Sequence, residues 1–365
     1  MSFKRSRDLK LTRGGLMSFG SDKLASPGAF RLTLAFAVFL HHTTNFNLGL
    51  PAVLIFFVLS GYWVATMWSN TYSKTAWAYL TYLVSRVWRL TPVFALCSAI
   101  SWALLYWRGD APDAVGGVAH QLLSNVMILG YNSLSYQANV PAWSLDMEMQ
   151  FYLIAPVIIF LLSRNIFFLG LCALVTIAAQ KLGGAVTVAP FVLFFGIGVA
   201  SACGGLQPSR KLAYGSLFAT LAVLIFGAAT LAKSVLLDPS HPAPLAFGST
   251  TNLLIAMLMV PWALYTTRQR GGAHDRMFGD LSYIFYLLHW SVIGALKTGE
   301  GSYVERLVLC SEALVLIFAV SYLIWRLFDH PINKLRAAWV SGRRALYEKA
   351  RALAAAEPAQ IAFGA

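Results

Sequence analysis

The sequence predicts an all-α polytopic membrane protein with about ten transmembrane helices and with the N- and C-termini in the cytoplasm. Three observations predict this fold class. Only 12% of the 365 residues are charged and 58% are hydrophobic, whereas a soluble domain carries about 25% charged residues. Ten apolar runs are long enough, together with their flanks, to cross a bilayer. The lysines and arginines also concentrate in every second loop between these runs.

The ten apolar runs account for almost the whole chain. The shortest need their flanking residues to reach the usual transmembrane length of about 20 residues. An even number of spans places both termini on the same side of the membrane. The runs lie at about 30–46, 50–68, 92–107, 144–163, 166–180, 187–204, 212–232, 247–266, 280–297 and 307–327.

The basic residues orient these helices. With the N-terminus in the cytoplasm, 23 of the 28 lysines and arginines fall on the cytoplasmic side and five fall outside, as the positive-inside rule requires. The net charge of +13 is therefore a topology signal, and we expect no nucleic-acid partner. The four cysteines have neither paired nor metal-type spacing, so we expect no disulfide framework and no metal site.

The segments outside the spans are short. We expect residues 1–28 to form a basic cytoplasmic leader, and residues 332–365 a basic cytoplasmic tail whose amphipathic helix rests on anionic lipid. Residues 29–331 form one transmembrane domain between them. The longest outer segment, 108–140, includes the stretch HQLLSNVMILGY, which predicts a surface or re-entrant helix. Residues 233–246 contain several prolines and predict an outer loop.

The first span carries two ionisable side chains on one face. Arg31 and His42 are eleven positions apart, which leaves their side chains only about 20° apart around a helix and about 16 Å apart along its axis. An ionisable group inside a membrane is costly and indicates function. Alternatively, Arg31 is an interfacial anchor and His42 a polar packing group. His41 lies about 100° away from this face and is secondary.

The stretch WSLDMEMQFY places two carboxylates, Asp146 and Glu148, at the outer mouth of the fourth span. Two positions apart on a helix, they face different directions. A carboxylate near a histidine can orient the imidazole and stabilise its cationic form. The alternative, an outer-surface carboxylate that meets water, fits Asp146 better than Glu148, which lies nearer the apolar run.

Two further stretches carry candidate site residues. LSYIFYLLHWSV places His289 in the middle or outer half of the ninth span, where a histidine also commonly makes an interhelix hydrogen bond. Arg86 and Arg89, at the cytoplasmic start of the third span, share a helix face and form a cationic fork suited to phosphate. Their alternative role is that of a positive-inside anchor.

Taken together, these stretches resemble the acyltransferase-3 family of integral membrane O-acyltransferases, in the stand-alone form without an SGNH-type esterase domain. The sequence departs from the family at Gly28, where aspartate is usual, and at Asp329-His330-Pro331, where Glu-x-Pro is usual. The motifs cover residues 28–331. They are Arg31 with His42 (arginine, ten residues, histidine), Phe56 to Gly61 (FFVLSG), Arg86, Arg89 and Pro92 (R-x-x-R-x-x-P), Trp143 to Tyr152 (WSL-x-x-E-x-x-FY), Phe195 with Gly196, and Leu281 to Trp290 (LSY-x-x-YLLHW).

The resemblance implies transfer of an acyl group, most commonly acetyl, from acyl-CoA to a hydroxyl of a carbohydrate such as an O-antigen, an exopolysaccharide or another surface or lipid-linked glycan. It implies acyl-CoA as co-substrate with no bound cofactor, a place in the bacterial inner membrane, and glycan-assembly machinery as a partner. In this scheme His42 is the general base or carries a transient acyl group, and Arg31 holds the donor. Glu148 and His289 are the candidates for orienting His42 or gripping the acceptor. The implied substrate-binding residues are Arg86, Arg89, His289, Tyr283, Trp143 and Ser60.

Two other function classes fit the topology. A transporter or flippase for a glycan or glycolipid also places ionisable residues near the midplane, but such folds are typically built from internal repeats with broken helices, and we find no repeat. A membrane sensor or an assembly subunit explains the spans but not the intramembrane histidines and Glu148.

Overall fold

The computed structural model describes residues 25–113, 115–183, 186–230, 249–272 and 274–362. Within these ranges the regular structure consists of helices only. The elements are α1 (Pro27–Thr43), α2 (Gly49–Asn70), η2 (Tyr72–Lys74), α3 (Ala78–Arg108), α4 (Val118–Met127), η3 (Tyr131–Ser133), η4 (Val140–Ala142), α5 (Trp143–Arg164), α6 (Phe168–Lys181), η5 (Ala189–Phe191), α7 (Val192–Ala202), α8 (Arg210–Thr230), α9 (Ser249–Thr266), α10 (Asp275–Ala295), α11 (Tyr303–Ile324), η6 (Trp325–Asp329) and α12 (His330–Ala362).

The helices follow the apolar runs of the sequence. Each of the ten predicted runs overlaps a helix, and α4 forms where a surface or re-entrant helix was expected. The proposed outer loop 233–246 lies outside the described residues. By length and composition, five helical segments of the described chain can cross a membrane: Gly49–Lys74, Ala78–Arg108, Val140–Arg164, Arg210–Gly227 and Tyr303–Ala354. The ten-span count and the cytoplasmic termini stay predictions.

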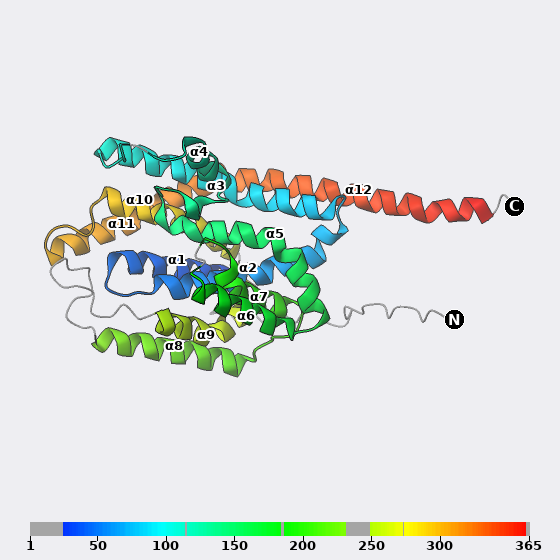
Figure 1. Cartoon of the computed structure of the whole chain (residues 1–365), viewed down its shortest axis with the longest axis horizontal. Coiled ribbons are helices and arrows are strands. Elements are labelled where there is room, and N and C mark those ends of the chain that lie inside the picture. The colour runs from blue at the N-terminus through cyan, green and yellow to red at the C-terminus, as the bar shows by residue number, and fades with distance from the viewer. Residues whose placement is uncertain (1–24, 114, 184–185, 231–248, 273, 363–365) are drawn as a thin grey trace.

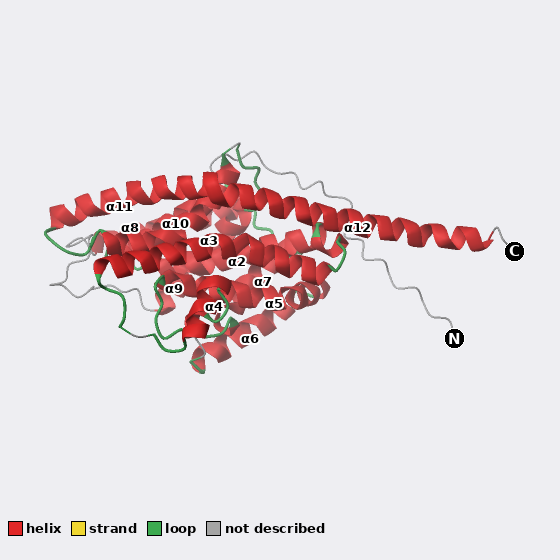
Figure 2. Ribbon diagram, turned by 90° about the horizontal axis from the view of Figure 1, so that it is seen from above, coloured by secondary structure: helices red, strands yellow, loops and turns green. Residues whose placement is uncertain are grey.

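The long helices lie side by side along the long axis of the molecule (Figure 1). A five-residue π-helical segment, η6, joins α11 to α12, and the three form one long rod along a side of the bundle (Figure 2). The helix predicted in the C-terminal segment is present as α12, and its cytoplasmic place and its contact with lipid stay predictions. Its first half packs on the protein: the backbone N–H of Ala76 donates to the carbonyl of Arg343 at 3.0 Å, and Arg343 donates back to the carbonyl of Ala76 at 3.2 Å.

Glycines allow α2 and α7 to cross in close contact. A Cβ on Gly61 would overlap the carbonyl oxygen of Phe195, and a Cβ on Gly198 would overlap that of Val58. The two backbones therefore lie in direct contact, which small residues allow at helix interfaces in membranes. The crossing explains why glycine follows FFVLS and holds α2 in place at the wall of the site.

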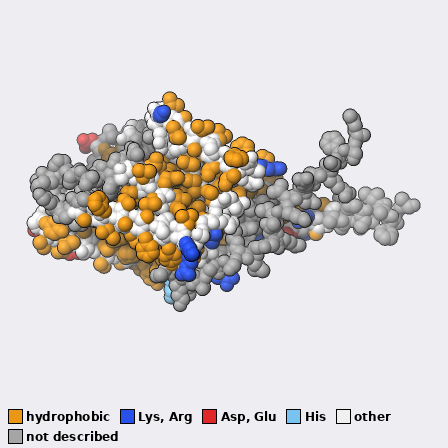
Figure 3. Space-filling view, turned by 90° about the horizontal axis from the view of Figure 1, so that it is seen from below, with side chains coloured by type: hydrophobic (Ala, Val, Ile, Leu, Met, Phe, Trp, Pro, Cys, Tyr) orange, Lys and Arg blue, Asp and Glu red, His pale blue; other side chains and the backbone are white. Residues whose placement is uncertain are grey.

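Large apolar side chains cover the outside of the bundle. Val157 on α5 is 60% exposed, Ile225 on α8 68% and Val315 on α11 69%. Hydrophobic side chains dominate the described part of one face in Figure 3. Exposed apolar surface on this scale is unusual for a soluble monomer and fits the hydrocarbon of a bilayer. The chain is a multi-pass membrane protein.

Candidate active site

Six charged side chains line a cavity of about 280 Å³. The cavity lies among six helices, so residues from both halves of the chain meet there. These helices are α1, α2, α3, α5, α10 and α12. Four arginines and two carboxylates supply its charges. They are Arg31, Arg86, Arg89, Arg336, Glu148 and Asp280, and Ser60, Tyr152, Tyr283 and Tyr286 also line the wall.

Arg31 is fixed by the way α1 begins. The helix starts at Pro27, and Asp275, the first residue of α10, caps it from across the interface. The carboxylate of Asp275 accepts hydrogen bonds from the backbone N–H of Gly28 at 2.8 Å and of Ala29 at 3.1 Å, and from the hydroxyl of Ser26. A negative charge at a helix N-terminus stabilises it.

Gly28 has no room for a side chain, because a Cβ there would overlap the carbonyl oxygen of Asp275. This contact accounts for the departure at position 28: a carboxylate does lie at the start of α1, but it comes from α10. Gly279 lies one turn farther along α10. The Nη1 atom of Arg31 lies 3.8 Å from the position that a Cβ on Gly279 would occupy, so the absence of a side chain there leaves room for the guanidinium group.

Glu148 lines the cavity from α5. Its Oε1 atom accepts hydrogen bonds from the Ser60 hydroxyl at 2.5 Å and from the Tyr152 hydroxyl at 2.6 Å. The other carboxylate oxygen has no hydrogen-bond partner among the described residues. Glu148 thus shares the cavity with Arg31, and within the described chain no contact joins it to His42. That the Glu148 carboxylate orients the His42 imidazole stays a prediction, and this arrangement does not favour it.

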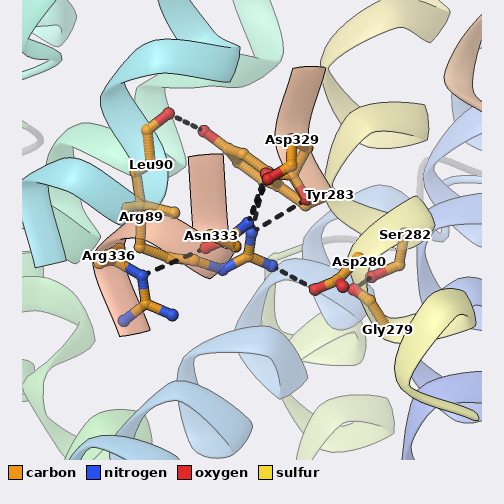
Figure 4. A network of polar contacts seen from close by, with 9 residues as sticks. All are labelled: Arg89, Leu90, Gly279, Asp280, Ser282, Tyr283, Asp329, Asn333 and Arg336. Carbon is orange, nitrogen blue, oxygen red and sulfur yellow. Dashed lines mark hydrogen bonds and ion pairs between the residues drawn. The ribbon is translucent and has the colours of Figure 1, made fainter. Parts of the chain in front are cut away.

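Arg89 forms ion pairs with two carboxylates. It donates to Asp280 at 2.7 Å and to Asp329 at 3.0 Å, which brings α3, α10 and η6 together (Figure 4). The side chain of Asp329 is 2% exposed and that of Asp280 21%. Arg89 therefore lines the cavity with its charge already balanced, which weighs against a fork in which Arg86 and Arg89 hold a phosphate together.

His42 lies beyond the cavity, in a cluster of rings. Its imidazole is 4.6 Å from that of His41, 5.3 Å from that of His289 and 5.0 Å from the Trp290 ring, measured between centroids. His289 is fully buried, and its Nδ1 lies 2.6 Å from the carbonyl oxygen of Tyr286. Because a carbonyl only accepts, Nδ1 carries the proton. The Nε2 atom of His289 has no hydrogen-bond partner in the described part of the chain.

One side chain lies between the cavity and the histidines. Tyr286 lines the cavity, and its ring centroid is 5.7 Å from that of His289. Its hydroxyl donates to the carbonyl of Pro141 at 2.7 Å and lies 2.8 Å from the Ser144 hydroxyl. These bonds connect η4 and the start of α5 to the middle of α10.

Two other predicted site residues have different places. The Tyr283 hydroxyl donates to the carbonyl of Leu90 at 2.8 Å, so its ring faces the cavity while its polar atom serves the α3–α10 interface. Trp143 is not among the residues that line the cavity. It packs against Phe57 and Phe191, with ring centroids 6.4 Å and 5.4 Å away.

The interpretation of Asp146 as a carboxylate that meets water is wrong. Asp146 is fully buried, and it accepts hydrogen bonds from the backbone N–H groups of Gly130 at 3.0 Å and Asn132 at 2.9 Å. Gln150 donates to it as well, at 3.1 Å. Asp146 thus fastens the loop after α4 to the start of α5.

Sequence reasoning missed three charged residues of the site and the place of a fourth residue. Asp275, Asp280 and Arg336 carry no signal of their own, because each is a common residue type near a helix end. The partners of the two aspartates are far away in the sequence: Asp280 is 191 residues from Arg89, and Asp275 is 247 residues from Gly28. Tyr286 belongs to the LSY-x-x-YLLHW motif, but the motif did not indicate that it lines the cavity and packs against His289.

Comparison with known proteins adds one finding. A family model described as an acyltransferase domain, of the acyltransferase-3 type, matches residues 24–326. No curated protein and no solved structure shows significant similarity to the chain. The matched region contains both the cavity residues from α1 to α10 and the histidine cluster, and it ends before α12.

Proposed function

Because the chain belongs to the acyltransferase-3 family and is therefore a membrane acyltransferase, we propose that it moves an acyl group, acetyl in the first instance, from acyl-CoA to a hydroxyl of a carbohydrate acceptor. The observation that carries the proposal is that the two ionisable residues of α1 lie in different surroundings. Arg31 faces a cavity rich in arginine, and His42, about 16 Å farther along the same helix, stacks on His289.

The cavity is suited to the anionic, nucleotide end of the donor. Its four arginines and two carboxylates leave it cationic, and guanidinium groups bind phosphate with bidentate geometry. The pantetheine arm is thin and flexible, and it would extend past Tyr286 toward the histidines. In this proposal Arg31 holds the donor between the phosphates and the thioester.

At the histidines, the proposed reaction is a direct acyl transfer. His42 accepts the proton of the acceptor hydroxyl as the oxygen attacks the thioester carbonyl, the carbon–sulfur bond breaks, and the CoA thiolate leaves and takes up the proton. His289 packs against the His42 ring and holds it at this level of the membrane. An acyl-histidine intermediate, in which His42 attacks first, gives the same products.

We further propose that the protein lies in a bacterial inner membrane, with the arginine-rich end of the helices on the cytoplasmic side, where acyl-CoA is made. The excess of lysine and arginine in alternate loops supports this orientation. The acceptor would be a surface polysaccharide or a lipid-linked glycan, for which the glycan-assembly machinery is the natural partner.

Sealed membrane vesicles of known orientation test the proposal. Acetyl-CoA labelled in its acetyl group is supplied on one side only, and the label in glycan and the free CoA thiol are measured. We expect both products with wild type when the donor is on the cytoplasmic side, and neither with His42→Ala or Arg31→Ala. Arg344→Gln, an exposed change on α12, is the matched control. Label transfer by well-inserted His42→Ala would refute the mechanism, and movement of unmodified glycan without CoA release would indicate a flippase.

A further inference from the structure

Arg86 and Arg336 form a cationic pair at the wall of the cavity. Arg86 is 8% exposed, and its Nη2 atom donates to the Tyr72 hydroxyl at 2.9 Å. Arg336 comes from α12 and donates from Nη1 to the Ser85 hydroxyl at 2.9 Å. The two hydroxyls lie 2.7 Å apart, so the two guanidinium groups converge on one Tyr72–Ser85 pair.

The pair lacks a counter-charge. Within the described residues neither Arg86 nor Arg336 has a carboxylate partner, and the Nε atom of Arg86 is buried without a hydrogen bond. Arg89, one turn from Arg86, differs sharply because two aspartates neutralise it. Arg86 is buried and Arg336 is half-buried, and two cations held near each other and partly removed from water are costly unless an anion joins them.

Arg336 is held in place by hydrogen bonds that lead through Asn333 to Asp329, the ion-pair partner of Arg89. Its Nε donates to the side-chain oxygen of Asn333 at 3.2 Å, and the amide nitrogen of Asn333 donates to Asp329 at 2.8 Å. Figure 4 shows the guanidinium end of Arg336 directed away from the Arg89 ion pairs. Because η6 is a π-helical segment, and such segments are frequent at functional sites, we attribute to it the placement of both Asp329 and Arg336.

We propose that Arg86 and Arg336 bind a phosphoryl group, and that α12 therefore completes the substrate cavity although it lies beyond the family match at residues 24–326. The identity of the ligand as the donor's phosphate rests on the proposed function. The headgroup phosphate of an anionic lipid offers the same chemistry. Two guanidinium groups can each donate two hydrogen bonds to one phosphate, which lysine cannot do.

The sequence alone points to a different pair. Arg86 and Arg89 are three residues apart and share a helix face, whereas Arg336 is 251 residues from its partner Ser85. It also lies in a segment predicted to be a cytoplasmic tail, which gave no reason to assign it to the site.

The test uses the purified full-length chain in phosphatidylcholine nanodiscs, which contain no anionic lipid. Binding of CoA, dephospho-CoA and inorganic pyrophosphate is measured for wild type, Arg336→Gln, Arg336→Lys and Arg86→Gln. Arg344→Gln is the control, because it removes the same charge from the same helix at an exposed ion pair with Glu348. Melting temperature and monodispersity confirm that each variant is folded, and Arg336→Lys provides a charge-conserving variant should Arg336→Gln be unstable.

We expect Arg336→Gln and Arg86→Gln to weaken CoA binding by at least about tenfold, the equivalent of one charge-assisted contact. Arg336→Lys should weaken it by less, and Arg344→Gln should bind as wild type does. A second arm adds phosphatidylglycerol and measures the lipid that stays bound to each variant. If wild type retains this lipid through Arg336 and does not bind CoA, the phosphoryl site is supported and the acyl-CoA donor is refuted. If folded Arg336→Gln binds CoA and anionic lipid as wild type does, the phosphoryl site is refuted while the acyltransferase proposal is unaffected.

Discussion

Removing Arg89 should destabilise the protein strongly, because two carboxylates depend on it. Arg89→Gln leaves Asp329, whose side chain is 2% exposed, without its ion-pair partner, and it also removes the ion pair of Asp280, whose side chain is 21% exposed. Removing one partner of a buried ion pair costs about 3–5 kcal/mol, since the remaining charge stays desolvated. Asp329 accounts for most of this cost, because Asp280 can still be hydrated.

The double variant Arg89→Gln/Asp329→Asn separates this explanation from a general loss of packing. It removes the stranded charge, so it should recover much of the lost free energy of unfolding, with a coupling between the two sites of about 0.5–3 kcal/mol. The assay is equilibrium unfolding in mixed micelles, with Arg344→Gln as a surface control that should change stability by less than about 1 kcal/mol. Arg89→Gln as stable as wild type, or a double variant no more stable than Arg89→Gln, would refute the reasoning.

Three further predictions concern single side chains. Glu148→Gln should lower kcat by about a hundredfold or more in the vesicle assay and leave the melting temperature near that of wild type. The reason is that the Glu148 carboxylate faces the cavity, and charged groups that stabilise a transition state have effects of that size. Unchanged turnover would show a structural role. Asp146→Asn should do the reverse and lower the free energy of unfolding by about 1–3 kcal/mol, because one oxygen cannot accept from both loop N–H groups, with kcat of the folded fraction unchanged. Gly28→Asp, which introduces the residue usual in the family, should lower the melting temperature, because its Cβ overlaps the Asp275 carbonyl; a stable and active Gly28→Asp would contradict the geometry of the α1 start.

Local periodicity predicted the helices and part of the site. The apolar runs mark the helices because a bilayer requires backbone hydrogen bonds to be satisfied within each segment. The helical repeat alone places Arg31 and His42 on one face, and α1 is continuous between them. The family resemblance made His289 a candidate for orienting His42, and the structure brings the two rings to 5.3 Å.

The sequence did not predict which charges meet across helices. Glu148 was expected to serve His42, yet it lies in the cavity with Arg31, because the depth of α5 relative to α1 depends on packing that no local pattern records. Arg89 was grouped with Arg86 by its spacing, but Asp280 and Asp329 neutralise it from helices about 200 residues away in the chain. Asp146 was taken for a surface group, because the backbone N–H groups that bury it belong to a loop without a recognisable motif.

The central claim is that this chain esterifies a carbohydrate by using His42. The most direct measurement is mass spectrometry of surface glycans from cells that carry the wild-type gene, the His42→Ala variant or no gene, with protein levels in the membrane matched between the first two. We predict an acyl ester that is present only with wild type. Identical glycans in all three strains, or an ester that persists with His42→Ala, would contradict the claim.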